Sequence, residues 1–215
     1  QNITIIKAYP AQEAQIVSKI HLNGTIQGIF INDNKLAIFE DSIDKTSIRI
    51  YDTTDKTNPA STRNVTIDGR YLDSRMIGNH AYAITTQSAI QWQYYSGSNI
   101  EIVLPKIYND NTNITIAPTE IYYTNVSDTY ETYTTIVSVN LENQQEEPAH
   151  KTFLIGSGSN TYVSQNNIYL TFSTYANWNT GTANQQTYIH RIHIENGQIN
   201  SNFTSGQVPG YVLNQ

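Results

Sequence analysis

One short phrase occurs three times in this chain, and it constrains the possible fold more than any other feature. The copies read FINDNKLAIF (Phe30 to Phe39), RMIGNHAYAIT (Arg75 to Thr85) and YVSQNNIYLTF (Tyr162 to Phe172). Each copy has an apolar start, a small polar turn that contains Asn, and a second apolar run. A repeated phrase of this kind indicates that the same supersecondary unit is used several times.

A second phrase follows each copy of the first, and consists of a strand, a polar loop, another strand and a Gly. It spans Thr46 to Gly69 and Thr135 to Gly158, and a looser version spans Tyr188 to Gly210. In the first two, the internal Pro59 and Pro148 are separated by the same 89 residues as the closing Gly residues. The run that ends at Gly24 fits the same second phrase, 45 residues before Gly69.

Together the two phrases predict four antiparallel strands per unit, arranged as an inner and an outer hairpin. Ile48 and Ile50 alternate with polar neighbours, which is the period of a half-buried strand. Asn196 and Gly197 suit a tight type I′ turn, because both of its central positions need positive φ. Four strands recurring at about 45 residues are typical of a β-propeller blade. A sandwich or barrel of irregular hairpins would also alternate, but neither requires a fixed period with matching Gly and Pro.

This interpretation predicts an all-β chain of about three and a half blades from a larger ring. Its second complete unit is longer than the period because it carries an insertion. Such insertions emerge on one rim of a propeller and either bind partners or pack on a neighbouring blade. The predicted units are 1–24 (outer half of a preceding blade), 25–69, 70–158 with the insertion 88–134, 159–208, and 209–215 (start of a further blade).

Composition narrows the class of partner. Tyr, Thr and Ile favour strands, and Asn and Gly favour turns. The formal charge is −6 and no basic cluster is present, so nucleic-acid binding is not expected. The absence of Cys excludes disulfides and thiolate metal sites. No apolar run approaches the roughly 20 residues that span a bilayer, and no signal peptide is visible, which suits an intracellular protein or a processed or truncated start.

Six Asn-x-Ser/Thr sequons are candidate glycosylation sites if the protein is exported. With 24 Asn and 42 Ser plus Thr in 215 residues, chance predicts roughly 4 to 5 such matches. The sequons are therefore compatible with glycosylation but do not demonstrate it. They lie at Asn2, Asn23, Asn64, Asn113, Asn125 and Asn202.

No catalytic, metal-binding or cofactor-binding residues are assigned from the sequence. His190 and His193 are three apart, so on a strand they point to opposite faces and are poorly placed to share an ion. The Asn-rich and Asp-rich turn at 32–34, like the one at 109–113, lacks the spaced carboxylates and bidentate Glu of a strong calcium loop. Glu146 and Glu147 are expected to be solvated in an outer turn.

Three stretches resemble a family of secreted, mainly archaeal and bacterial proteins that carry a β-propeller domain distantly related to WD-40 repeats. They are GRYLDSRMIGNHAYAITTQ (69–87), IRIYDTTDKTNPASTRNVTIDG (48–69) and the terminal VPGYVLNQ (208–215), and DSRMIG is their most specific part. The resemblance implies an exported or cell-surface propeller. It carries over no enzyme activity and no catalytic residue.

The sequence thus favours a non-enzymatic, extracellular or cell-surface binding or structural module. Its expected partners are the remaining blades, from the same protein or another chain, and a surface protein or glycan. Two alternatives stay open. One is a fragment of an extracellular hydrolase or lyase whose site is completed by other blades. The other is a subunit of a surface filament or layer, completed by strand exchange.

Overall fold

The computed structural model describes residues 1–93, 99–110, 112–123, 132–155, 160–176 and 184–213, and in this part the chain is built almost entirely of β-strands. A two-stranded sheet contains β1 (Asn2–Lys7) and β2 (Gln15–His21), linked through the 3-10 turn η1 (Ala11–Glu13). The second sheet contains β3 (Thr25–Asn32), β4 (Lys35–Ser42), β5 (Lys45–Asp52) and β6 (Ala60–Asp68). The third contains β7 (Arg70–Ile77), β8 (His80–Ser88), β14 (Thr132–Asn140) and β15 (Ala149–Leu154). The fourth contains β16 (Asn160–Val163), β17 (Asn167–Ala176), β18 (Asn184–Glu195) and β19 (Gln198–Pro209).

The repeated Asn has the same structural role in each unit. It lies in the turn of the inner hairpin, β3–β4, β7–β8 or β16–β17, as the sequence predicts. Its main-chain carbonyl then accepts a hydrogen bond from the end of the third strand of the same sheet or from the residue directly after it. The pairs are Thr53 N to Asn34 O (2.7 Å), Leu141 N to Asn79 O (2.9 Å) and Ile194 N to Asn166 O (2.9 Å). The three copies of the phrase thus share one structural role, since each places an Asn carbonyl where it accepts the same main-chain hydrogen bond.

The outer hairpins also form where the sequence places them. β5 and β6 turn over the segment that contains Pro59, and β14 and β15 turn over the segment that contains Pro148. In the turn between β18 and β19, Asn196 and Gly197 have φ values of 47° and 81°. Both positive angles agree with the predicted tight turn.

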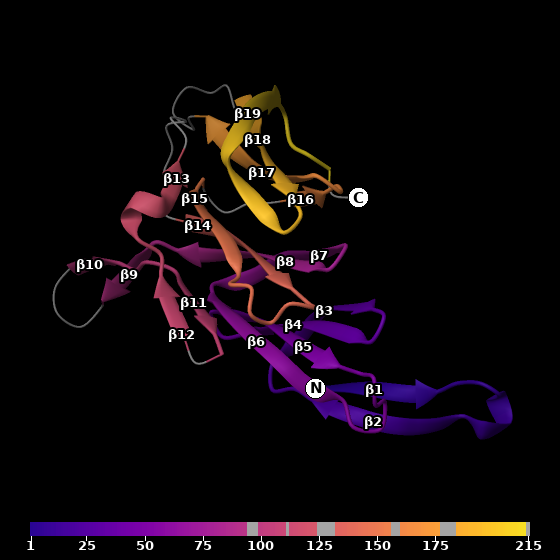
Figure 1. Ribbon diagram of the computed structural model, residues 1–215. Coiled ribbons are helices and arrows are strands. Elements are labelled where there is room, and N and C mark those ends of the chain that lie inside the picture. The colour runs from indigo at the N-terminus through magenta and orange to yellow at the C-terminus, as the bar shows by residue number, and fades with distance from the viewer. Residues whose placement is uncertain (94–98, 111, 124–131, 156–159, 177–183, 214–215) are drawn as a thin grey trace.

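Successive sheets pack face to face, and the middle sheets are covered on both sides. In the third sheet, Ala83 and Val137 face a core shared with the second sheet. Their neighbours Ile84 and Ile136 face a core shared with the fourth. A two-layer sandwich has only one such interface, so the sandwich alternative is not supported. Figure 1 shows the sheets following one another from the indigo β1–β2 hairpin to the yellow β18–β19 hairpin, as expected for part of a propeller.

The DSRMIG phrase holds three neighbouring sheets together at their first strands. Thr161 Oγ1, on β16, donates a hydrogen bond to Asp73 Oδ2 on β7 at 2.6 Å. On the other side, a Cβ added to Gly28 of β3 would lie only 2.9 Å from Ser74 Oγ. The specificity of this phrase therefore has a structural cause, the close approach of β3, β7 and β16.

We expect Gly197→Ala to destabilise the protein by about 1–3 kcal/mol. Its φ of 81° is unfavourable for an L side chain, and the new Cβ would lie 2.3 Å from atoms of the His80 ring in the neighbouring sheet. The matched control is Gly206→Ala on β19, where no atom lies within 4 Å of the added Cβ. Chemical denaturation measures both variants, and equal stability of the two would contradict this account.

Candidate functional site

The insertion adds strands to the outer edges of two neighbouring sheets. After β8, the hairpin of β9 (Ile90–Gln93) and β10 (Asn99–Ile102) extends away from the other sheets (Figure 1). The next hairpin, β11 (Lys106–Asn109) with β12 (Thr112–Thr115), joins the second sheet because β11 pairs antiparallel with β6. The 3-10 turn η2 (Pro118–Glu120) then leads to β13 (Ile121–Tyr123), which pairs parallel with β15 of the third sheet. Of the two roles expected for the insertion, packing on a neighbouring blade is observed.

Two apolar side chains fix the insertion in the main core. Ile107 is 1% exposed and Ile116 is fully buried, and both belong to the cluster between the second and third sheets. Burying an Ile side chain contributes roughly 1.5–3 kcal/mol. The insertion is therefore part of the folded body, because these two side chains attach it to the core between the second and third sheets.

Arg63 of β6 connects the insertion to the third sheet. Its side chain is almost completely buried, with 2% exposure. Nε donates to Asn109 Oδ1 at 3.1 Å, and Nη2 donates to the main-chain carbonyl of Glu146 at 2.6 Å. Burial lowers the pKa of Arg63, while the nearby Asp110 and Glu147 act in the opposite direction. A guanidinium suits this position because its planar fork reaches two separate acceptors.

We expect Arg63→Met to cost about 1–3 kcal/mol, because it leaves partly buried acceptors without a donor. Arg191→Met, on the exposed face of β18, should change stability by less than about 0.5 kcal/mol. Denaturant titration of both variants tests this. If the two variants are equally stable, Arg63 does not hold the insertion in place.

Two adjoining cavities lie on the rim from which the insertion emerges. The larger, about 870 Å³, is bounded by the β2–β3 link at Asn23 and the β4–β5 turn at Ile43. The smaller, about 470 Å³, is bounded by the end of β8 at Gln87 and by Gln91 and Val103 of the insertion. Asp44 and Arg70 line both cavities, so the two form a continuous groove. We call this feature the rim groove.

The rim groove combines polar groups with one exposed apolar side chain. Arg70 is exposed and, in the part of the chain that the structure describes, has no carboxylate partner. Asp41 and Asp44 lie near it on the groove wall, and Ile43 at the turn tip is 93% exposed. Such a surface can bind a polar chain through hydrogen bonds and one apolar contact. Sequence reasoning did not bring these residues together, because Arg70 at the start of β7 lies 26 residues after Asp44 in the β4–β5 turn.

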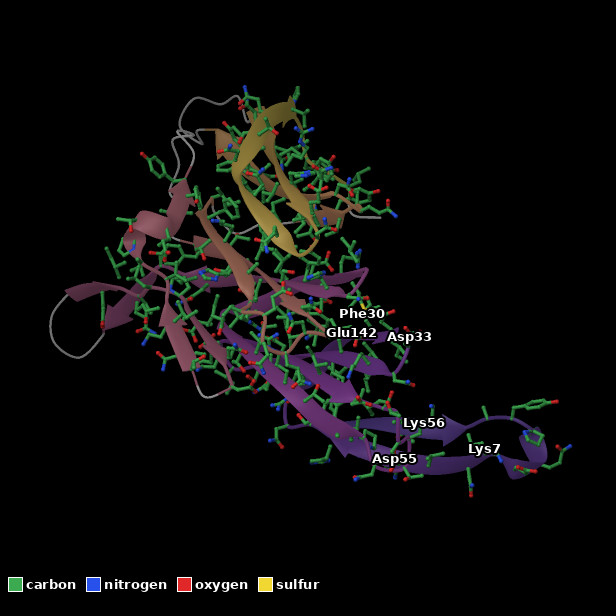
Figure 2. All side chains as sticks on the ribbon, viewed as in Figure 1. Lys7, Phe30, Asp33, Asp55, Lys56 and Glu142 are labelled. Atoms are coloured by element: carbon green, nitrogen blue, oxygen red, sulfur yellow. The ribbon has the colours of Figure 1, made fainter. Side chains whose placement is uncertain are left out.

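The opposite ends of the strands carry a second, more acidic hollow of about 460 Å³. It includes Asp33, from the Asn-rich and Asp-rich turn at 32–34, and Glu142, and Figure 2 shows these two residues close together. Lys35 forms an ion pair with Asp52 there at 2.9 Å. The hydrogen bonds from Thr54, and after them the bond from Lys35, keep the pKa of Asp52 below its usual value. No group of three or more metal-ligating His, Cys, Asp or Glu side chains is found among the described residues.

The structure places His190 and His193 on opposite faces of β18, as predicted. His193 is solvated, whereas His190 is fully buried between Phe172 and Phe203. His190 Nδ1 lies 2.7 Å from Ser205 Oγ, and its Nε2 is buried without a partner in the described structure. Burial lowers the pKa of His190 to about 4. The ring acts as a neutral aromatic core residue.

This burial predicts a loss of stability in acid. The unfolded chain binds a proton near pH 6.5, but folded His190 does so only near pH 4, so protonation favours unfolding as the pH falls through this window. We expect the wild type to lose up to about 3 kcal/mol more than His190→Phe between these pH values. His193→Phe is the matched control and should keep the wild-type slope. A His190→Phe slope equal to that of the wild type would contradict this assignment.

The described sequons differ in accessibility. Asn2, Asn23, Asn113 and Asn202 are exposed. Asn64 is half-buried in β6 between β5 and β11, with its Oδ1 enclosed. Asn125 lies outside the described residues.

The expected solvation of the outer-turn carboxylates is only partly met for Glu146. Its side chain is only 34% exposed, and it accepts a hydrogen bond from Asn140 Nδ2 at 2.7 Å. His80 Nε2 of the same sheet lies 3.7 Å away. The sequence did not indicate this contact because His80 lies 66 residues earlier in the chain. Glu147 is exposed, and it accepts a hydrogen bond from Asn109 Nδ2.

Comparisons with known proteins agree with the arrangement of sheets. A family model described as "Beta propeller domain" matches residues 1–215. An uncharacterized protein of Archaeoglobus fulgidus is 26% identical over 181 residues, which cover 80% of this chain and 25% of that protein. The chain thus spans about a quarter of the length of this relative. In the described residues, no helix is long and apolar enough to cross a membrane.

Proposed function

Because the chain belongs to the β-propeller domain family, we propose that it is the partner-binding part of an exported propeller and engages its ligand at the rim groove. The observation that carries this proposal is the groove itself, where Arg70 and Asp44 join two cavities beside the insertion. Propeller rims are rigid platforms for such contacts, because the stacked sheets fix the positions of their turns.

The polarity of the groove favours a polar ligand such as a glycan or an extended peptide. Asp41, Asp44 and Arg70 offer both acceptors and donors, and Ile43 offers an exposed apolar contact. The stacked sheets, with the insertion paired to their outer edges, form a rigid body. Such a body would present these groups with little loss of side-chain or loop entropy on binding. An extracellular location is part of this proposal and suits the four exposed sequons.

We expect Arg70→Ala to weaken binding at least about tenfold, since it removes a central charged donor. The protein would be applied to glycan and peptide arrays, and the affinity for each hit then measured by calorimetry. Lys56→Ala, a matched loss of one positive charge in the β5–β6 turn, at the end of β5 opposite to the β4–β5 turn of the groove, should leave affinity unchanged.

Two results would overturn the proposal. Equal loss of affinity in Arg70→Ala and Lys56→Ala would show that binding does not use the groove. Turnover of an array hit, seen as a cleaved product, would instead support the hydrolase or lyase alternative.

A further inference from the structure

One candidate glycosylation site lies on the wall of the rim groove. Asn23 lines the larger cavity together with Gly24 and Thr25, which complete its Asn-Gly-Thr acceptor sequence. Asn23 and Thr25 are both exposed. None of the other described sequons has its Asn on the wall of either cavity. A modification of Asn23 would therefore change the groove itself.

The chain on either side of Asn23 is held firmly. Leu22 is 3% exposed and belongs to the apolar cluster beneath the β1–β2 sheet. Gly24 donates its main-chain N–H to the buried Glu40 carboxylate. A Cβ added to Gly24 would lie 2.5 Å from the main-chain oxygen of Asp41, so the link packs closely against β4. Asn23 is the exposed point of this link, and its place on the groove wall is fixed.

The side chain of Asn23 is available for reaction, unlike those of two other sequons. In the part of the chain that the structure describes, its side-chain amide has no hydrogen-bond partner. The side chain of Asn2 is instead bonded to His21 Nδ1 at 2.6 Å. Asn64 Oδ1 is enclosed in the second sheet. Asn23 is thus an accessible acceptor at the rim where the groove opens.

We propose that Asn23 carries an N-linked glycan, and that this glycan occupies the rim groove and so regulates ligand binding there. This inference rests on the exported location and the binding role proposed above. In the transfer, Asn23 Nδ2 forms a bond to the anomeric carbon of a sugar, and the bond from that carbon to the phosphate of a glycosyl phosphate donor breaks. The phosphate leaves with the electron pair, and Nδ2 gives up one proton to a base.

The groove has the chemistry to hold sugars attached at Asn23. Arg70 supplies hydrogen-bond donors and Asp44 supplies acceptors for their hydroxyl groups. Ile43 is 93% exposed on the same groove, and offers an apolar contact to the C–H face of a sugar ring. A tethered ligand has an effective concentration on the order of millimolar. Even weak contacts therefore keep the glycan in place, where it excludes a ligand from solution.

Mass spectrometry of the protein secreted by a host that glycosylates exported chains tests whether Asn23 is occupied. We expect Asn23→Gln to lose the mass of one glycan, because the acceptor nitrogen is no longer in a sequon. Thr25→Ser is the matched control and should keep that mass, since Ser also completes the acceptor sequence. An unmodified Asn23 in the secreted wild type would overturn the proposal.

Thiol labelling tests whether the glycan covers the groove, and it needs no ligand. Residues 1–215 contain no Cys, so Ile43→Cys places a thiol at the groove and Lys56→Cys places one in the β5–β6 turn. We expect a bulky maleimide to label Ile43→Cys at least about fivefold slower before enzymatic deglycosylation than after it. Labelling of Lys56→Cys should not change.

Two labelling results would contradict the proposal. The first is an equal rate for Ile43→Cys before and after deglycosylation. The second is slow labelling of Ile43→Cys that persists when Asn23→Gln is added, because another glycan would then cover the groove.

Affinity for an array hit connects the glycan to ligand binding. We expect secreted Asn23→Gln to bind a hit at least about tenfold more tightly than the secreted wild type, because the tethered competitor is absent. Asn202→Gln, which removes an exposed sequon on β19 of the fourth sheet, should bind like the wild type.

The two proposals fail in different ways. If the unglycosylated protein binds no array component, the proposed function fails, while the labelling rates still decide whether the glycan covers the groove. If a hit is bound through Arg70 and Asn23→Gln binds it no better than the secreted wild type, the proposed function stands and the regulation by Asn23 is wrong.

Discussion

The whole structure depends on apolar strands being buried on both faces of each central sheet. One four-stranded sheet cannot hide both faces, so it requires a neighbour on either side. Ile38 and Phe39 of β4 are both fully buried although they are adjacent, because Ile38 faces the β1–β2 side and Phe39 faces the third sheet. Stacking around an axis satisfies this requirement repeatedly with the same template.

Buried polar groups add specific contacts within the sheets and between them. Glu40 is 3% exposed, and it accepts hydrogen bonds from the Gly24 amide and from Arg49 Nε, the latter at 2.5 Å. Burial would raise the pKa of Glu40, but these bonds outweigh it and hold the pKa below its usual value. Arg63 and Asp73 act similarly on the two sides of the third sheet. Each such group is costly to leave unpaired, so it specifies one arrangement.

The insertion shows how one sheet can be modified without loss of the architecture. The insertion connects β8 to β14, the second and third strands of its sheet. These two strands still pair directly with each other, so the sheet is not interrupted. Its added strands β11 and β13 cover the outer edges of β6 and β15, which would otherwise be open to pairing. The same segment forms one wall of the rim groove, so edge protection and the candidate binding surface have a common origin.

The sequence by itself determined the hairpins, the strand period and the family, because turn residues such as Asn196 and Gly197 and alternation such as that of Ile48 and Ile50 act locally. It also indicated that His190 and His193 point apart. Only the tertiary structure decided which edge the insertion covers, that Glu146 is partly buried, and that Arg70 lines a groove. These features join residues that are far apart in the chain, and their contacts depend on how successive sheets are packed rather than on any local pattern.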